Sequence, residues 1–169
     1  MTYVIKYVLL NVLGPAIPHP KIRSWYLRLL GARIGKNVRI ENVRFIQIQG
    51  RLANFECADN VFIGSSVLID LSDRLLLGRS AIVAPGCSLI THRDFGDFNG
   101  NAVASIFPKE TAPITIGNDA VVGCDTTILA GARIGSFSVI GAKSLVLGEI
   151  PANSLAMGIP ARFVRKLRD

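Results

Sequence analysis

The stretch that decides the fold is residues 114–147, ITIGNDAVVGCDTTILAGARIGSFSVIGAKSLVL. Every sixth residue is a branched aliphatic followed by Gly or Leu, and the position four places later is small. The aliphatics are Ile116, Val122, Ile128, Ile134, Ile140 and Val146, and the small residues are Ala120, Thr126, Ala132, Ser138 and Ser144. A period of six fits neither an α-helix, which repeats about every 3.6 residues, nor the alternation of a flat strand. It predicts a coil with flat faces and sharp corners, in which aliphatics fill a narrow axis, glycine lets the backbone turn, and the small residue fits beneath the next corner.

The same repeat extends toward the N-terminus with irregularities. It begins at Ile34 and Gly35, blurs through residues 44–60, and resumes at Ile63. Its frame then shifts by two residues before Leu77, as expected where a coil carries a bulge or a slightly longer face. Between residues 91 and 113 the pattern stops, and a loop of this length in a compact repeat is usually functional or disordered. The tail, residues 156–169, is basic and is expected to end in a short helix.

Residues 1–31 are expected to form a helical cap on a coil domain of residues 32–169. Two short helices are predicted at residues 3–13 and 21–30, joined by a proline-containing link. In the second helix, Ile22, Trp25, Tyr26 and Leu29 form one apolar face. We expect this helix to pack on the coil end, whose strand edges would otherwise be open. The alternative is a basic amphipathic helix that rests on a membrane.

Composition narrows the function classes. No uncharged apolar run approaches the roughly 20 residues of a spanning helix, and residues 3–13 do not resemble a secretory signal. The cysteines Cys57, Cys87 and Cys124 lack paired spacing, which favours a reducing compartment and buried thiols. Two histidines far apart in the sequence argue against a zinc site, so no metal is expected.

The charge balance points to an anionic partner. Nineteen basic residues against twelve acidic ones give a net charge of +7. A phosphate-bearing cofactor or an acidic membrane surface would suit this balance. Nucleic acid is not expected, because the aromatic residues do not alternate with basic ones as on a base-stacking surface.

Three features together resemble the hexapeptide-repeat acyltransferases, and most of all the small sugar O-acetyltransferases such as maltose and galactoside acetyltransferases. They are the repeats, the loop that opens with His92 after VAPG at 83–86, and the closing GIPAR at 158–162. The resemblance covers roughly residues 34–168. It implies a mainly β fold, a left-handed parallel β-helix, which is an exception to the right-handed crossover rule. It also implies a homotrimer with active sites between neighbouring coils, and acetyl-CoA as the donor.

The resemblance also assigns catalytic roles. It makes His92 the general base, and a histidine suits this task because the unperturbed pKa of imidazole, about 6.5, lies near working pH. Asp94 and Asp97 are near enough in sequence to orient its ring. The backbone amides around Gly123 and Cys124 are candidates to stabilise the oxyanion.

For the cofactor, the resemblance implies contacts at the corners and in the tail. Cys124 and Ala142 follow the corner glycines Gly123 and Gly141 and would lie along the pantetheine arm. Arg162 and Arg165, with Lys166 beside them, would hold the phosphates of CoA, which guanidinium groups can grip in pairs.

Some positions depart from the sugar enzymes. Val121 stands where a tryptophan is common, Leu147 and Gly148 replace a Thr-Lys pair, and residues 64–66 lack an expected asparagine. The sequence nevertheless predicts a cytoplasmic acetyl-CoA-dependent O-acetyltransferase that acts on a sugar or glycan precursor by direct transfer. Peripheral membrane contact through the N-terminal helices stays open. The alternatives are an N-acetyltransferase acting on a nucleotide amino-sugar, a serine acetyltransferase, or a non-catalytic β-helix scaffold.

Overall fold

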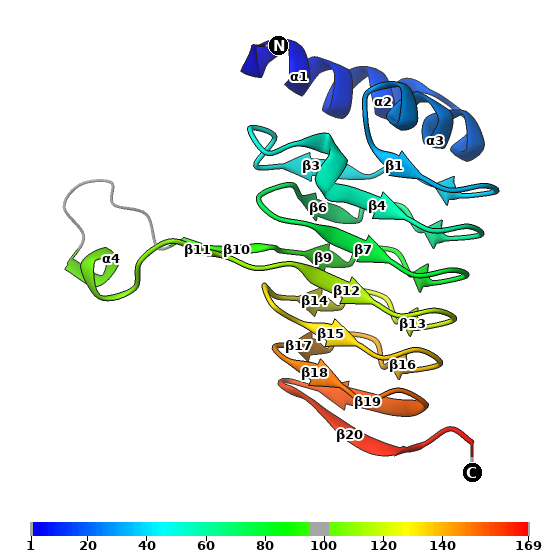
Figure 1. The fold of residues 1–169 in the computed structure, drawn as a ribbon, viewed down its shortest axis with the longest axis vertical. Helices are drawn as coiled ribbons and strands as arrows, with labels where there is room; N and C mark the ends of the chain where they lie inside the picture. Colours follow the sequence, from blue (N-terminus) through cyan, green and yellow to red (C-terminus); the bar gives the residue numbers. More distant parts are fainter. Residues whose placement is uncertain (1, 95–101, 169) are drawn as a thin grey trace.

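The computed structural model describes residues 2–94 and 102–168, and these form a parallel β-helix with helices over its N-terminal end (Figure 1). Each coil contains short strands separated by corners, and successive coils stack into three sheets. Sheet A contains β1 (Arg33–Ile34), β4 (Phe55–Cys57), β7 (Leu75–Leu77), β12 (Ile114–Ile116), β15 (Arg133–Ile134) and β18 (Glu149–Ile150). Sheet B contains β2 (Arg39–Ile40), β5 (Phe62–Ile63), β8 (Ile82–Val83), β13 (Val121–Val122), β16 (Val139–Ile140), β19 (Ser154–Gly158) and β20 (Ala161–Lys166). Sheet C contains β3 (Arg44–Ile46), β6 (Leu68–Asp70), β9 (Ser88–Leu89), β14 (Thr127–Ile128) and β17 (Leu145–Val146).

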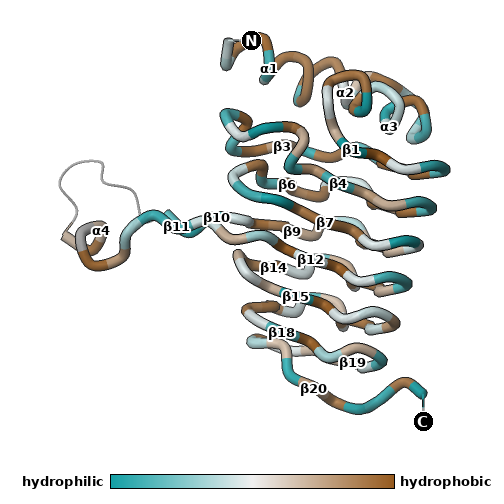
Figure 2. Tube along the Cα trace, viewed as in Figure 1, coloured by the Kyte–Doolittle hydropathy of each residue, from teal (hydrophilic) through white to brown (hydrophobic). Residues whose placement is uncertain are grey.

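The predicted coil is confirmed residue by residue in the stretch 114–147. Ile116 pairs with Ile134, Val122 with Ile140, and Ile128 with Val146, so each aliphatic lies on its equivalent one coil later. These six side chains are at most 2% exposed, and the five small residues of the repeat are also buried. Figure 2 shows the hydrophobic positions recurring along the stack of coils. The apolar axis therefore accounts for the period of six.

The corner glycines serve a different purpose from the one predicted. A Cβ atom on Gly117 would lie 2.5 Å from the backbone nitrogen of Ser136, and one on Gly123 would lie 2.6 Å from that of Ala142. The left-handed backbone conformation falls two residues after each glycine, at Asp119 (φ 56°) and Asp125 (φ 57°). Glycine is thus required because the next coil approaches closely, whereas the turn is made two residues later by a residue with positive φ, which is Phe137 or Lys143 in the following coil.

Most irregularities of the repeat fall at one corner, between sheets C and A. The first coil is also one residue short between sheets B and C, because Ile40 and Phe45 pair with Ile63 and Ile69. Ile69 still pairs with Leu89 and Leu77 with Ile116, so the frame shift is a longer corner at residues 71–74 and not a bulge within a strand. One coil earlier, the same corner holds the 3-10 helix Leu52–Asn54 within residues 47–54. One coil later, residues 90–113 leave from it. We call these three consecutive connections the His92 corner.

The predicted loop at 91–113 contains regular structure. Strands β10 (His92–Arg93) and β11 (Glu110–Thr111) form an antiparallel pair, and α4 (Ala102–Ile106) lies beyond them, to the side of the coils (Figure 1). Asp97 lies outside the described residues. The excursion is therefore anchored to the coil by a short hairpin stem that begins at His92.

The N-terminal segment contains α1 (Tyr3–Val8), a π-helical stretch (Leu9–Leu13), α2 (Gly14–Ala16) and α3 (Pro20–Leu29). Helix α3 lies over the first coil, where Arg23 Nη1 donates to the carbonyl of Ile40 (3.1 Å) and Ser24 Oγ to that of Val38 (2.8 Å). The buried residues of α3 are thus Arg23, Ser24 and Leu27. The apolar face points away from the coil, with Trp25 55% exposed. The open coil end presents carbonyl groups, so the helix turns its donors toward it and leaves its apolar face outside.

The tail is a strand, and the expected C-terminal helix was wrong. Strand β20 runs antiparallel to β19 and lies on the last edge of sheet B. Phe163 and Val164 favour an extended backbone, and pairing with β19 closes an edge that would otherwise lie open. The conformation of the tail thus depends on the open strand edge at the end of the coil, which the sequence of the tail alone does not show.

Candidate active site

His92 lies at the His92 corner and makes a close contact with a buried carboxylate. Its Nδ1 is 2.5 Å from Oδ2 of Asp70, which comes from the same corner one coil earlier. The Asp70 side chain is fully buried, whereas the His92 ring is 16% exposed. Since an ionised carboxylate only accepts hydrogen bonds, Nδ1 carries the hydrogen and Nε2 of the neutral ring is left as the basic nitrogen.

Asp70 is held in place by further donors. The backbone N–H of Thr91 donates to Oδ2 (2.8 Å), and the N–H and hydroxyl of Ser72 donate to Oδ1 (2.9 and 2.8 Å). Burial raises the pKa of Asp70, but the hydrogen bonds from His92 and Ser72 and the charge of His92 together lower it below its ordinary value. Asp70 is therefore ionised at neutral pH and can stabilise a protonated His92.

A third coil contributes to the same corner. Gln47, at the start of the first of the three connections, places its Nε2 3.4 Å from Nε2 of His92. Gln47 itself has a left-handed backbone (φ 47°). The residues that surround the imidazole thus come from three successive coils, each of which departs from the six-residue repeat there.

The structure changes the predicted partner of His92. Asp94 forms an ion pair with Lys109, with 3.1 Å between Oδ2 and Nζ. The carboxylate that contacts His92 belongs to Asp70, which sequence reasoning missed. A signal was present, because the frame shift marks an enlarged corner immediately after Asp70, one coil before His92.

His92 opens onto a cavity of about 600 Å³. Apolar side chains of Ile90, Leu129 and Leu147 line one part of it. Charged groups line another part, where Arg93 pairs with Glu110. A cavity of this size, with apolar walls and a few polar groups beside a base, can hold a small acceptor molecule.

The predicted cofactor residues lie at another corner, between sheets B and C. We call residues 123–125 and 141–143 the Cys124 corner. Cys124 and Ala142 are exposed there. Beside them is a hollow of about 430 Å³ lined by Asp125, Lys143 and Ile159, among others. Two expectations need correction. The N–H of Gly123 donates to Ile140 (2.9 Å) and is not available to an oxyanion, and Cys124 is not a buried thiol.

Cys57 and Cys87 are the buried thiols. Burial raises the pKa of the Cys87 thiol to about 11, and burial also raises that of Cys57. A thiol with a raised pKa is almost wholly protonated at neutral pH and is a poor nucleophile.

The basic tail residues do not form one cluster. Arg162 pairs with Met157, whose side chain packs against Gly141 of the Cys124 corner. Arg165 pairs with Leu155 and Lys166 with Ser154, farther along the strand. At about 3.3 Å per residue, Arg162 and Lys166 are roughly 13 Å apart. The structure therefore brings Arg162 to the Cys124 corner and leaves Arg165 and Lys166 away from it.

The two corners border opposite edges of sheet C. Strand β14 starts after the Cys124 corner and ends on the side of the His92 corner, so the width of the sheet separates them. Within the part of one chain that the structure describes, His92 is not brought together with Cys124, Ala142 or Arg162. A site that uses both sets needs a second chain or a long ligand.

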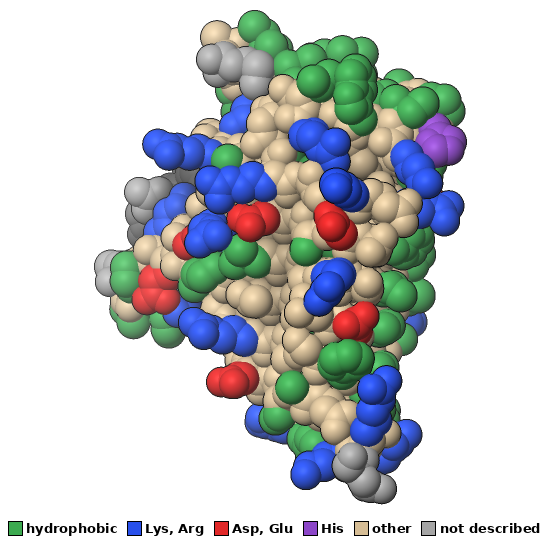
Figure 3. Space-filling view, turned by 45° about the vertical axis from the view of Figure 1, so that its right-hand side comes forward, with side chains coloured by type: hydrophobic (Ala, Val, Ile, Leu, Met, Phe, Trp, Pro, Cys, Tyr) green, Lys and Arg blue, Asp and Glu red, His purple; other side chains and the backbone are tan. Residues whose placement is uncertain are grey.

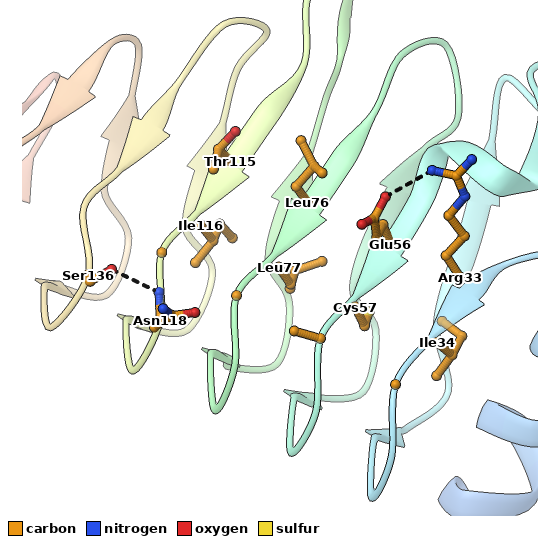
Figure 4. A pocket seen from close by; sticks show the side chains of 14 residues that line it. Arg33, Ile34, Glu56, Cys57, Leu76, Leu77, Thr115, Ile116, Asn118 and Ser136 are labelled. Atoms are coloured by element: carbon orange, nitrogen blue, oxygen red, sulfur yellow. Dashed lines mark hydrogen bonds and ion pairs between the residues drawn. The ribbon is translucent and has the colours of Figure 1, made fainter.

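A further hollow, of about 570 Å³, lies over sheet A and its corner with sheet B (Figure 4). Its charged lining residues, Arg33 and Glu56, form an ion pair (3.3 Å), and Ser136 Oγ accepts a hydrogen bond from the backbone N–H of Asn118 (3.1 Å). No histidine lines it. Among the described residues, no group of three or more His, Cys, Asp or Glu is placed to hold a metal ion. The His92 corner is therefore the best candidate for chemistry.

Comparison with known proteins relates this fold to acetyltransferases. None of the protein-family models matches the chain. The chain is 28% identical to galactoside O-acetyltransferase of Escherichia coli over 149 residues, 87% of this chain and 70% of that protein. It is 34% identical to a probable serine acetyltransferase of rice over 122 residues, 70% of this chain and 38% of that protein.

A solved structure of galactoside acetyltransferase in complex with coenzyme A has the same fold. It aligns with a TM-score of 0.71 and 25% identity, over 98% of this chain and 78% of that one. The resemblance to the hexapeptide-repeat acyltransferases is thereby confirmed, and the fold is their left-handed parallel β-helix.

Proposed function

We propose that this protein is an acetyl-CoA-dependent O-acetyltransferase acting on a hydroxyl of a sugar or glycan precursor. The single observation that carries this proposal is the His92–Asp70 pair beside a cavity, in a chain similar to galactoside O-acetyltransferase. Such a transfer needs a base for the hydroxyl proton and the two reactants held in line. Acetyl-CoA would be used in the cytoplasm, where it is made.

The proton chemistry falls to His92. Its Nε2 accepts the proton of the acceptor hydroxyl while that oxygen bonds to the acetyl carbonyl carbon. Asp70, ionised and buried, stabilises the resulting imidazolium. His92 then returns the proton to the CoA sulfur as the carbon–sulfur bond breaks. The transfer is direct, so no acetyl group becomes attached to the protein.

The Cys124 corner fits the donor. Acetyl-CoA supplies the activated thioester, and its phosphates are anionic. Lys143 and Arg162 are exposed cations at this corner, and the small, exposed side chains of Cys124 and Ala142 would leave room for the pantetheine chain. These residues would hold the cofactor.

A homotrimer would complete the site. A three-fold axis parallel to the coil can set the Cys124 corner of one chain against the His92 corner of its neighbour. Support comes from an apolar ladder on the outer face of sheet B, where Phe62, Ile82, Val121, Val139 and Leu155 are in register and partly exposed. Exposed apolar surface of this kind is commonly buried between subunits.

The test is CoA thiol release from acetyl-CoA with a panel of acceptors. We expect release with sugar hydroxyls and not with serine or amino-sugars. Serine is the second candidate because of the rice relative, so it belongs in the panel. Release with serine alone would indicate that the protein is a serine acetyltransferase. No release with any acceptor, in protein that binds acetyl-CoA, would favour a non-catalytic scaffold.

A further inference from the structure

The N-terminal helices expose a broad apolar face at the end of the molecule. The face includes Tyr3, Val4, Val12, Ile22, Trp25 and Leu29, which are 50–68% exposed. Figure 2 shows hydrophobic colour over these helices, and Figure 3 shows hydrophobic side chains gathered at the same end. We call this surface the roof. Exposed apolar side chains gathered at one end of a domain often mark a contact surface.

The roof is not needed to cover the coil. Helix α3 reaches the first coil with its opposite side, through Arg23, Ser24 and Leu27. Arg28 adds a hydrogen bond from Nε to the carbonyl of Ile34 (3.0 Å). The N-terminal helices thus pack on the coil through these hydrogen bonds and through the buried Leu10 and Leu27, and the exposed apolar face remains available to a partner.

Charge identifies the kind of partner. Residues 1–40 contain seven basic residues and no acidic one, whereas the remaining 129 residues contain twelve of each, so the N-terminal end carries the entire net charge of +7. Lys21, Lys36 and Arg39 are exposed near the roof. The nearest acidic residues in sequence, Glu41 and Glu56, already pair with Arg23 and Arg33. Figure 3 shows basic side chains beneath the apolar end.

We propose that the roof rests on the anionic surface of a lipid bilayer, with the coil axis pointing away from it. An apolar helix face flanked by basic residues lies in the interface plane of such a surface, where Trp and Tyr rings are favoured. None of the helices in the described residues is long and apolar enough to cross a bilayer, so the contact is peripheral. In the proposed trimer, three roofs would share one end and bind together.

Trp25 is the sole tryptophan of the chain and lies in the roof, so its fluorescence reports the contact in the unmodified protein. The protein is titrated with vesicles of phosphatidylcholine alone and with vesicles containing phosphatidylglycerol. We expect a blue shift of the emission, and quenching by brominated acyl chains, with the anionic vesicles only. Added salt should weaken the binding because basic residues contribute to it. Unchanged emission with both kinds of vesicle would overturn the proposal.

A matched pair of substitutions tests whether vesicle binding depends on the roof or on any exposed apolar side chain. Leu29→Gln changes a roof residue that is 64% exposed, and Ile106→Gln changes one on α4 that is 69% exposed. Glutamine keeps helix propensity in both. Binding is measured by co-sedimentation with the anionic vesicles. Leu29→Gln should raise the lipid concentration at which half of the protein is bound several-fold. The triple variant Ile22→Gln, Trp25→Gln, Leu29→Gln should raise it on the order of tenfold or more. Ile106→Gln should bind like the parent.

Circular dichroism and light scattering distinguish the remaining outcomes. The triple variant should keep its fold and its mass while losing vesicle binding. A folded triple variant that binds vesicles like the parent would refute the proposal. A smaller particle mass for the triple variant would show that the roof joins copies of this chain, which also refutes it. If the triple variant does not fold, the Trp25 emission of the parent and the single-variant pair decide.

Discussion

The His92 corner and the Cys124 corner border the same sheet but are built differently. At the Cys124 corner the repeat is regular, since Gly123 and Gly141 take the same position in successive coils and each coil makes the same turn. At the His92 corner three successive coils each depart from the repeat, and they bring Gln47, Asp70 and His92 together. Regular corners stack into a uniform groove that suits an extended ligand. A broken corner provides the different side chains that chemistry requires.

The largest expected effect comes from removing the base. His92→Asn should lower turnover by roughly 10²- to 10⁴-fold, because the amide can hydrogen-bond the acceptor but cannot take its proton. The matched control is His19→Asn, since His19 is the other histidine, where it caps α3 by accepting the N–H of Lys21 (3.2 Å). Asparagine is also a good N-cap. Steady-state kinetics with saturating acetyl-CoA measure both variants, and a similar loss in both would contradict the role of His92.

A smaller loss is expected from the positioning residue. Asp70→Asn keeps the shape of the side chain but cannot stabilise the imidazolium, so we expect turnover to fall roughly 10- to 100-fold while the Michaelis constant for acetyl-CoA stays near that of the parent. The pH profile should change as well, because the charged partner of His92 is gone. A purely structural role would instead leave the pH profile of the folded enzyme unchanged.

The regular corners should be sensitive to a single methyl group. Gly117→Ala places a Cβ 2.5 Å from the next coil, whereas Gly148 has nothing within 4 Å of its Cβ position. We expect Gly117→Ala to lower the free energy of unfolding by about 1–3 kcal/mol, as overpacking does, and Gly148→Ala to have little effect. Chemical denaturation measures both. Equal stabilities would mean that the coils can separate to admit the methyl group.

The tail gives the next smaller effect. Arg162→Gln, at the Cys124 corner, should raise the Michaelis constant for acetyl-CoA several-fold, and Arg165→Gln, farther along β20, should raise it less. High salt should reduce the difference between parent and variant because both groups are exposed. Equal effects of the two substitutions would show that the cofactor follows the whole strand.

The smallest effect is on acid stability. The pKa of Asp70 is lower in the folded protein, so its ionised form contributes stability above its ordinary pKa of about 3.9, and this contribution is lost as the pH falls through the folded value. The melting temperatures of the parent and Asp70→Asn should therefore differ by a constant amount above that ordinary pKa and converge as the pH falls below it. A difference that does not narrow below that pKa would mean that the lowered pKa does not stabilise the fold.

The contrast between regular and irregular corners also explains which features of the structure could be predicted from the sequence. The coil and its inward residues were predictable because each repeat meets the same neighbours, as when Val122 lies on Ile140. The contact of Asp70 with His92 was not, because it depends on how corners of unequal length stack. The outward apolar face of α3 and the strand at 161–166 were missed for a common reason. In both places the conformation and orientation of the segment depend on the backbone groups at the open end of the coil, and not on the segment's own helix or strand propensity.

If the two corners meet across a chain boundary, two variants that are each inactive should complement one another. His92→Asn disables one corner, and Ala142→Trp, which fills the exposed groove, disables the other. Each variant alone should be inactive. When the two are mixed in equal amounts, unfolded and refolded together, neighbours in a trimer combine at random and about a quarter of the sites regain both intact corners. We expect recovery of roughly a quarter of the parent activity, whereas mixed trimers that stay inactive would rule out a site shared between chains.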